Sequence, residues 1–467
     1  MKKLYTLFTL LLICLSGSAQ RWIELGRGTS ALNATGSIYS IISDPMGHVY
    51  AAGAFTEEAY DSAYVAQWSG AGWTELGTGA TALHANGSIY SIARDGQGNI
   101  YAAGNFTDSN NRVYVAKWNG SQWSEIGRDT AGLNATAPIY ALTTDAANRV
   151  YAAGAFGDQL FSFHNYYYVA VWDGRWTEVG FDTASTLRAD SIIYAITYDT
   201  RRGYLYAAGA FRDTNGYAYV AAWDGSRWSE LGTGRSALRA NGAIKTVITD
   251  SAGHVYAAGD FTDSAGHYYI AEWVNGKWFE LSSLADQISI RGPINALALD
   301  SAGNVYAGGM IPDSTGNYVI VAEWDGSRII AADNGGRSPI NADDAILSMC
   351  SDHWGNIYAA GNFKDDNTTM YVAEFTSNAA LAIAPISSTS LRLYPNPTSG
   401  TIYLHAEQLS GTATVEIIDA LGRVIHSQRI ESSTIYTSID LSPYATGVYT
   451  LTLRDAAGTT MRRIVKQ

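Results

Sequence analysis

The amino-acid sequence predicts an all-β protein, and three observations lead to that prediction. The phrase Tyr-Ala-Ala-Gly returns at intervals of 50 to 55 residues. Glycine is abundant, with 47 residues, beside 13 Trp and 31 Tyr, and no long stretch shows the apolar period of a helix. Short aromatic runs are separated by Asn-Gly and Asp-Gly pairs, which supply the positive φ angles of tight hairpins. Such a pattern is typical of many short strands.

Each repeat contains four strand-like runs, which in the first full unit are residues 38–43, 48–55, 64–68 and 73–77. The second run carries Ala-Ala-Gly and the outer two carry tryptophans, so small residues suit the crowded centre and large ones the rim. This taper predicts a seven-bladed β-propeller over residues 20–377, in which most tryptophans serve as core. The seven copies begin at Tyr50, Tyr101, Tyr151, Tyr206, Tyr256, Tyr306 and Tyr358, and the copy at Tyr306 reads Tyr-Ala-Gly-Gly.

The two ends of the repeat region are complementary. A lone fourth run at residues 21–26 precedes the first unit, and the last unit stops after a third run at residues 371–375. We therefore predict that the N-terminal strand around Trp22 pairs with the strand of Phe375 and closes the last blade. Closure would leave no open end between the first and last sheets.

The repeats resemble kelch-like and related propeller repeats of secreted bacterial proteins. The phrase that carries the resemblance is Trp-Asp-Gly-Ser-Arg-Trp-Ser-Glu-Leu-Gly at residues 223–232. The resemblance extends from Arg21 to about Ser377. It implies a fold far more than an activity, because propellers serve as lectins, enzymes and scaffolds.

The N-terminus has the pattern of a secretory signal peptide over residues 1–19. Two lysines precede an apolar run, and a small-residue segment ends at Ala19, so cleavage is expected between Ala19 and Gln20. The formal net charge of −13 disfavours nucleic acid and anionic lipid as partners. Only Cys350 remains after cleavage, which excludes an intrachain disulfide.

The composition changes after Phe375, and residues 378–389 are interpreted as a linker. Residues 390–467 then alternate as strands with turn signals, which predicts a small β-sandwich. Four ordered elements, the last of them the basic end of the chain, resemble the C-terminal sorting domain of type IX secretion cargo of Bacteroidota. These elements are Tyr-Pro-Asn-Pro at 394–397 with Gly400, the Asp419/Gly422-Arg423 turn, Gly-Val-Tyr at 447–449 and residues 462–466.

The type IX resemblance implies export through the secretion machinery and a secreted or outer-membrane surface location. In this family the sorting domain is usually removed, and the product is released or fixed to surface lipopolysaccharide. An ordinary Ig-like adhesive module is the alternative reading of the same segment. We expect no membrane span in the mature chain and a monomeric protein.

Positions at which the seven units differ are free to serve function. After the first Ile of the innermost run the residue changes from unit to unit, so these side chains are candidates for the mouth of a central channel. Packing between blades is the alternative role. The candidate binding residues are Tyr39, Tyr90, Tyr140, Tyr194, Lys245 and Asn295, followed by Leu347 in the last unit.

Two further features lie on the loops between the second and third runs. The loop of the third unit is the longest and carries Phe161, Phe163 and His164, which could contact a ligand or fold over the blade. Every unit also has an acidic residue in this loop. A repeated carboxylate could bind cations, but backbone capping is the expected role. The seven acids are Glu57, Asp108, Asp158, Asp213, Asp263, Asp313 and Asp365.

The sequence contains no recognisable catalytic constellation. It has no His-x-x-x-His or Cys-x-x-Cys spacing for a metal and no Gly-x-Ser-x-Gly elbow. We therefore expect a binding protein for an extracellular glycan or protein, without catalytic residues, metal or cofactor. A polysaccharide-active enzyme that uses two carboxylates and a purely structural surface protein remain as alternatives.

Overall fold

The computed structural model describes the chain from Trp22 to Gln467 apart from a set of short gaps. The chain divides into two compact units, of which one is Arg21–Ser377 and the other contains Asn378–Gln467. The predicted signal peptide, its cleavage site at Ala19 and Gln20, and the predicted linker lie outside the described residues. The gaps are residues 27, 58–60, 129–130, 159–165, 182–184, 283–285, 287, 314–315, 317–318, 333–339, 341, 366–367, 376–389, 395–397, 408–411, 420–422, 431–434 and 456–457.

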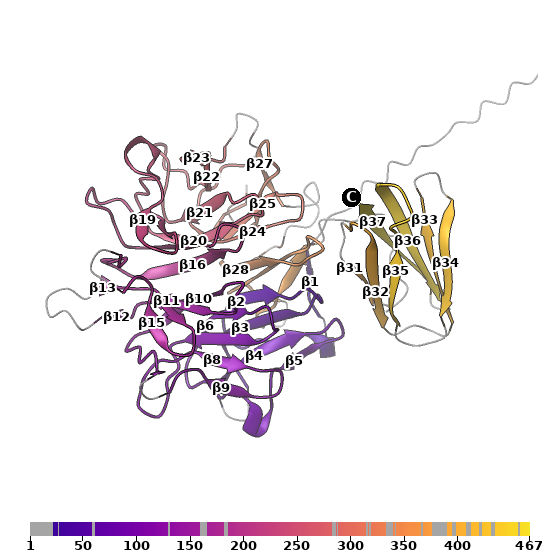
Figure 1. Cartoon of the computed structure of the whole chain (residues 1–467), viewed down its shortest axis with the longest axis horizontal. Coiled ribbons are helices and arrows are strands. Elements are labelled where there is room, and N and C mark those ends of the chain that lie inside the picture. Colours follow the sequence, from indigo (N-terminus) through magenta and orange to yellow (C-terminus); the bar gives the residue numbers. More distant parts are fainter. Residues whose placement is uncertain are drawn as a thin grey trace, which may run out of the picture. The chain divides into compact units, whose positions relative to one another are not determined.

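The Arg21–Ser377 unit is all-β, as predicted, and contains seven four-stranded antiparallel sheets (Figure 1). Six of them consist of four strands that follow one another along the chain, apart from the separate pair β12 (Gly157–Asp158) and β13 (Tyr166–Tyr167) between the second and third strands of one sheet. They are β2 (Ile38–Ser43), β3 (Val49–Thr56), β4 (Ala63–Trp68), β5 (Trp73–Glu75); β6 (Ile89–Arg94), β7 (Ile100–Gly104), β8 (Ala116–Trp118), β9 (Trp123–Glu125); β10 (Ile139–Thr144), β11 (Val150–Gly154), β14 (Ala170–Trp172), β15 (Trp176–Glu178); β16 (Ile193–Asp199), β17 (Tyr204–Gly209), β18 (Ala221–Trp223), β19 (Trp228–Glu230); β20 (Ile244–Thr249), β21 (Val255–Gly259), β22 (Ala271–Val274), β23 (Lys277–Glu280); and β24 (Ile294–Leu299), β25 (Val305–Gly309), β26 (Ala322–Trp324), β27 (Ile329–Ala331).

The seventh sheet joins the two ends of this unit. It consists of β28 (Ile346–Ser351), β29 (Ile357–Gly361), β30 (Ala373–Phe375) and, at its edge, the N-terminal strand β1 (Trp22–Glu24). Trp22 pairs with Phe375 in the register, and their rings stack with centroids 5.0 Å apart. The predicted pairing of these two segments is therefore confirmed.

The first strands of the seven sheets contact one another in a cycle in which β28 packs against β2. A serine hydroxyl joins neighbouring first strands at equivalent positions. The Ile92 amide donates to Ser40 Oγ at 3.1 Å, and the Leu142 amide donates to Ser91 Oγ at 3.0 Å. The Ile41 amide donates to Ser348 Oγ at 3.0 Å, so the junction of the last and first sheets repeats the contact made elsewhere.

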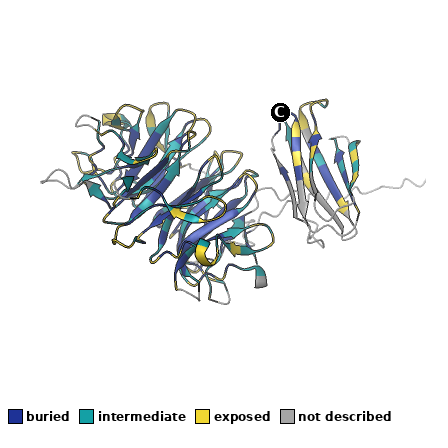
Figure 2. Cartoon of the chain, turned by 60° about the horizontal axis from the view of Figure 1, so that its bottom comes forward, coloured by how far each residue is buried: buried dark blue, intermediate teal, exposed yellow. Residues whose placement is uncertain are grey.

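In six of the seven sheets a tryptophan of the fourth strand connects the sheet to the preceding one, whereas β27 has Ile329 at this position. The indole Nε1 of Trp73 donates to the Leu25 carbonyl at 2.8 Å, and equivalent bonds recur around the unit. At the junction of the two ends, Trp22 Nε1 donates to the Ala332 carbonyl at 2.8 Å. Burial follows the inner strands, whereas exposed residues gather in the loops (Figure 2). The other indole bonds are Trp123 to Leu76, Trp176 to Ile126, Trp228 to Val179 and Trp278 to Leu231.

The repeated tyrosine of Tyr-Ala-Ala-Gly is also held by a repeated carboxylate. Asp95 accepts the amides of Gln97 and Asn99 at 2.9 Å and the hydroxyl of Tyr101 at 3.0 Å. The same tyrosine-to-aspartate bond forms in five other sheets. These pairs are Tyr50–Asp44, Tyr151–Asp145, Tyr256–Asp250, Tyr306–Asp300 and Tyr358–Asp352.

In the sheet of Tyr306 a second carboxylate approaches the same hydroxyl. Glu323 is only 6% exposed, and its burial, together with Asp300 and Asp325, raises its pKa to about 7. The folded state therefore holds the proton more tightly than the unfolded chain does. The stability that this bound proton contributes is complete below pH 4.5 and is lost as the pH rises to 7 and above.

We expect Glu323→Gln to raise the unfolding free energy at pH 8 by about 1–2 kcal/mol and to change it little at pH 4.5. The first sheet already carries Gln67 at the equivalent position, where its Nε2 lies 3.4 Å from the Tyr50 hydroxyl. Denaturant midpoints of both proteins at the two pH values measure the effect. An equal shift at both values would contradict the titration of Glu323.

Among the described residues, short 3₁₀ turns precede first strands at Gly28–Ser30, Gly79–Thr81 and Gly234–Ser236. A two-stranded ribbon of β12 (Gly157–Asp158) and β13 (Tyr166–Tyr167) lies between β11 and β14. In the part of the chain that the structure describes, no helix has the length and apolarity to cross a membrane.

The C-terminal unit has two antiparallel sheets that share one apolar core. Leu404 comes from the first sheet, and Val415 and Leu451 come from the second, and all three are fully buried. The first sheet is β31 (Ser390–Tyr394), β32 (Thr401–Glu407) and β35 (Ile435–Asp440). The second is β33 (Ala413–Ile418), β34 (Val424–Ile430), β36 (Gly447–Asp455) and β37 (Gly458–Lys466).

Candidate binding site

A β-bulge lies at the same point of all seven sheets. In the first sheet Ile38 pairs with Gly53 and Ser40 with Ala52, so Tyr39 is an extra residue with no partner of its own. A bulge redirects the side chain of the extra residue away from the regular alternation of the strand. The extra residues are the six candidates predicted from the sequence and Leu347, namely Tyr39, Tyr90, Tyr140, Tyr194, Lys245, Asn295 and Leu347.

The repeated glycine of the second strand explains how each bulge is accommodated. A Cβ atom at Gly104 would lie 1.9 Å from the Ser88 carbonyl oxygen and 2.9 Å from Ile89 Cα. Only a residue without a side chain permits this approach of the two backbones. The glycine thus places the extra residue, which we call a ring residue, on the innermost strand of each sheet.

Four ring residues form a continuous aromatic arc. The ring centroids of Tyr39 and Tyr90 are 5.3 Å apart, those of Tyr90 and Tyr140 are 5.3 Å apart, and those of Tyr140 and Tyr194 are 5.9 Å apart. All four side chains are half-buried. Partial burial and the neighbouring rings raise the pKa of Tyr90, so its hydroxyl stays protonated at neutral pH.

The next two ring residues form a polar arc. Lys245 Nζ lies 2.7 Å from Asp260 Oδ1 and donates to Asn295 Oδ1 at 3.3 Å. Asn295 Nδ2 in turn donates to the Ile346 carbonyl at 3.0 Å. Burial, then Tyr140 and Asp260, raises the pKa of Tyr194, so the acidic side of the polar arc adjoins the last tyrosine.

Asn362 adds an acceptor beside the seventh ring residue. Its amide donates to the Ala345 carbonyl at 2.9 Å, as the Asp260 amide does to Ala243 two sheets earlier. Its side-chain Oδ1 is buried and has no hydrogen-bond partner among the described residues. A buried acceptor without a donor is costly unless a ligand or water supplies one.

The acidic residues of the loops between second and third strands mainly cap the backbone. Asp108 Oδ1 accepts the amides of Asn110 and Arg112 at 2.8 and 2.9 Å, and the Arg112 bond is the main cause that lowers the pKa of Asp108. Asp213 and Asp263 make equivalent bonds. Within the described ranges, no group of three or more His, Cys, Asp or Glu residues could hold a metal.

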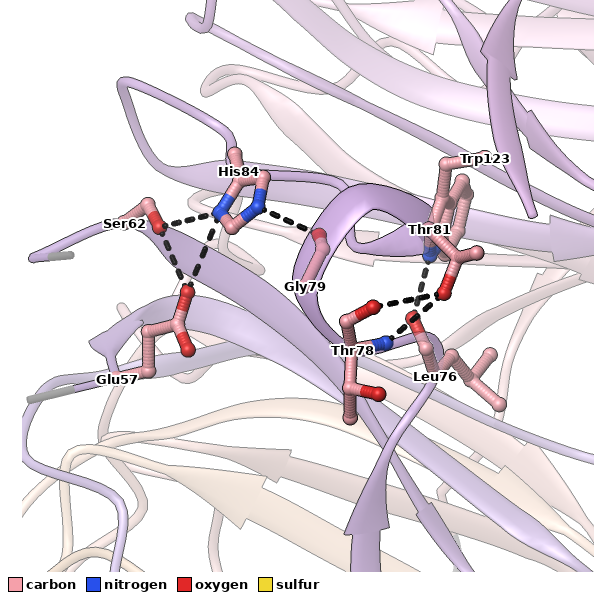
Figure 3. Close-up of polar contacts among 8 residues, drawn as sticks. All are labelled: Glu57, Ser62, Leu76, Thr78, Gly79, Thr81, His84 and Trp123. Atoms are coloured by element: carbon pink, nitrogen blue, oxygen red, sulfur yellow. Dashed lines mark hydrogen bonds and ion pairs between the residues drawn. The ribbon is translucent and has the colours of Figure 1, made fainter. Parts of the chain in front are cut away.

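Glu57 departs from this capping pattern and forms a cluster that the sequence analysis missed (Figure 3). The Ser62 hydroxyl donates to Glu57 Oε1 at 3.1 Å, and His84 Nδ1 lies 3.4 Å from the same oxygen. Burial, followed by the charge of Glu57, raises the pKa of nearby Glu75 to about 7. The signal in the sequence was Glu57 itself, because the other six units have aspartate there.

The geometry of this cluster does not match a nucleophilic triad. Both the carboxylate and the serine face the same nitrogen, His84 Nδ1, with the serine 3.5 Å away. The other nitrogen, Nε2, lies 2.8 Å from the Gly79 carbonyl, and Ser62 is only 7% exposed. A triad needs the two partners on opposite nitrogens of the imidazole.

The structure places the six candidates of the innermost strands at equivalent positions of neighbouring sheets. The three loop candidates are not among the described residues. Phe161, Phe163 and His164 lie in residues 159–165, outside the described residues. The ribbon of β12 and β13 flanks that segment on both sides.

Comparison with known protein families assigns the C-terminal unit to a family. Residues 392–467 match the family described as the secretion system C-terminal sorting domain. No curated protein matches the chain.

Two solved structures are similar to the chain at low identity. One is PorZ, described as an essential bacterial surface component of the type IX secretion system of Porphyromonas gingivalis, with 15% identity and a TM-score of 0.47. The match covers 92% of this chain and 59% of PorZ, so the chain spans less than two thirds of that protein. The other is a protein of unknown function from Bacteroides thetaiotaomicron, with 12% identity, a TM-score of 0.41 and coverage of 77% and 76%.

The family match bears on the location of the protein. A sorting domain of this kind is the part of a cargo that the type IX secretion machinery recognises. The chain therefore carries a type IX secretion C-terminal sorting domain and is exported to the cell surface or secreted.

Proposed function

We propose that the seven sheets of the Arg21–Ser377 unit form a kelch-like seven-bladed β-propeller that binds a glycan outside the cell. The cycle of first strands and the β1–β30 pairing support this architecture. The sorting domain delivers the unit to the surface or the medium. The ligand meets the ring residues on the innermost strands.

The unequal ring is the observation that carries this proposal. The bulge and the glycine opposite it repeat from sheet to sheet, whereas the identity of the ring residue does not. An aromatic arc offers faces on which sugar rings stack, and the polar arc of Lys245, Asp260 and Asn295 offers donors and acceptors for hydroxyls. A few polar groups beside an apolar surface are typical of small-ligand sites.

Binding without catalysis is the role that we propose for this site. The tyrosines and the paired Lys245 and Asp260 orient a ligand but do not form a general acid and base pair. The overall acidic charge favours a neutral glycan over an anionic one.

A glycan array probed with the full chain tests the proposal. We expect Tyr140→Ala to weaken binding of the retained glycans at least tenfold, because Tyr140 contacts both neighbouring tyrosines of the arc. Tyr217→Ala is the matched control, since Tyr217 is 39% exposed and lies outside the ring. Circular dichroism and unfolding midpoints show whether each variant is folded.

Three outcomes would contradict the proposed function. One is an array without retained glycans, and another is a folded Tyr140→Ala variant that binds as well as the unchanged protein. The third is release of shorter oligosaccharides from a bound glycan, which would indicate a polysaccharide-active enzyme.

A further inference from the structure

Two grooves that do not include the ring residues occur at equivalent places in consecutive sheets. Each is lined by a leucine from the loop before the first strand, a tyrosine before the third strand, and the tryptophan and glutamate of the fourth strand. The Arg128 groove, of about 470 Å³, is lined by Leu83, Tyr114, Trp123, Glu125 and Arg128. The Phe181 groove, of about 410 Å³, is lined by Leu133, Tyr168, Trp176, Glu178 and Phe181.

The two grooves differ at their outer wall. Arg128 Nε lies 3.4 Å from Glu125 Oε2, so the first groove ends in an ion pair. Phe181 holds the equivalent position in the second groove and is 72% exposed, the highest value among large apolar side chains in the described part of the chain. The second groove therefore has an exposed aromatic ring at the position where the first has an ion pair.

The inner wall of the Phe181 groove is rigid. Trp176 Nε1 donates to the Ile126 carbonyl at 3.1 Å, and its ring lies 5.7 Å from that of Trp172. A Cβ atom at Gly127 would come within 2.8 Å of Trp176 Cδ1, so the indole is packed closely from behind. Tyr168 is similarly fixed against Phe156, with ring centroids 5.1 Å apart. The groove thus exists before any ligand arrives, which reduces the entropy lost on binding.

We propose that the Phe181 groove is a second binding site, for one or two units of a neutral saccharide. Trp176 and Phe181 provide aromatic surface for the C–H face of a sugar ring, and Glu178 and the exposed Arg175 provide partners for its hydroxyls. The volume lies in the range of about 300–1,000 Å³ that small-ligand sites occupy. An acidic chain with a carboxylate in the groove disfavours an anionic sugar.

This inference does not depend on the ring residues, so the two sites are tested separately. Native gels that contain soluble mannan, xylan or β-glucan measure retardation of the full chain by each polysaccharide. We expect at least one to retard the protein and Phe181→Ala to weaken that retardation about tenfold. Phe181→Trp is expected to keep it, whereas Phe181→Arg, which copies the other groove, is expected to lose it.

Arg128→Ala is the matched control in the equivalent groove and is expected to leave retardation unchanged. Tyr140→Ala tests the ring and is expected to leave the component that depends on Phe181. The proposal is overturned if none of the three polysaccharides retards the protein. It is equally overturned if Phe181→Ala and Phe181→Arg are retarded like the unchanged chain.

Discussion

Replacing Trp22 by alanine is expected to lower the free energy of unfolding of the Arg21–Ser377 unit by about 3–5 kcal/mol. Trp22 is 6% exposed and stacks on Phe375, which is fully buried. The substitution also removes the indole bond to the Ala332 carbonyl and leaves that carbonyl without its donor. Because these contacts join the two ends of the unit, their loss weakens the pairing of β1 with β30.

Thermal and denaturant unfolding of the full chain measures this effect. Phe279→Ala is the control, because Phe279 lies on a fourth strand as Trp22 does but is 49% exposed. It is expected to change the unfolding free energy by less than about 1 kcal/mol. If Trp22→Ala unfolded at the same midpoint as the control, the closing role of β1 would be wrong.

Gly104→Ala is expected to cost about 3 kcal/mol or more, or to prevent folding. The added methyl group would lie 1.9 Å from the Ser88 carbonyl oxygen, and neither backbone can move without breaking the pairing of β6 and β7. The same glycine recurs opposite each bulge, so the prediction extends to the other sheets.

Gly308→Ala provides the contrast within the chain. It stands where the other units have alanine, and its added methyl group would meet side-chain atoms of Ile346 and Met349 at 2.6 Å rather than backbone. The Met349 side chain can adjust, whereas Ile346 is fully buried and β-branched, so the expected cost is about 1–2 kcal/mol. Comparison of the two unfolding midpoints tests the distinction, and equal losses would contradict it.

The strand content and the pairing of the two ends were predictable from the sequence. A lone run before the first unit and a missing run in the last unit leave one pairing that completes every sheet. The register of β1 and β30, with Trp22 opposite Phe375, is that pairing. The sorting domain was equally visible, because its motifs keep their order along the chain. The alternation of residues and the turn chemistry are local properties, which a sequence displays directly.

The bulge and the grooves were not predictable in the same way. The sequence singled out Tyr39 and its equivalents because they vary, but the reason they share a place is the register shift opposite Gly53. Likewise, the tryptophans were expected to pack, yet their indole bonds to the preceding sheet depend on the spacing between sheets. The contact of Glu57 with His84 also joins residues from different loops, and the exposure of Phe181 is a property of the folded chain.

By itself the sequence determined the all-β class, the number of repeated units, the partner of the N-terminal strand and the route of export. These follow from the order and periodicity of residues along one chain. Only the tertiary structure decided which side chains meet: the ring residues, the Glu57 cluster and the two grooves. Such contacts depend on how separate sheets approach one another, and that distance is set by packing and backbone geometry rather than by neighbours in the sequence.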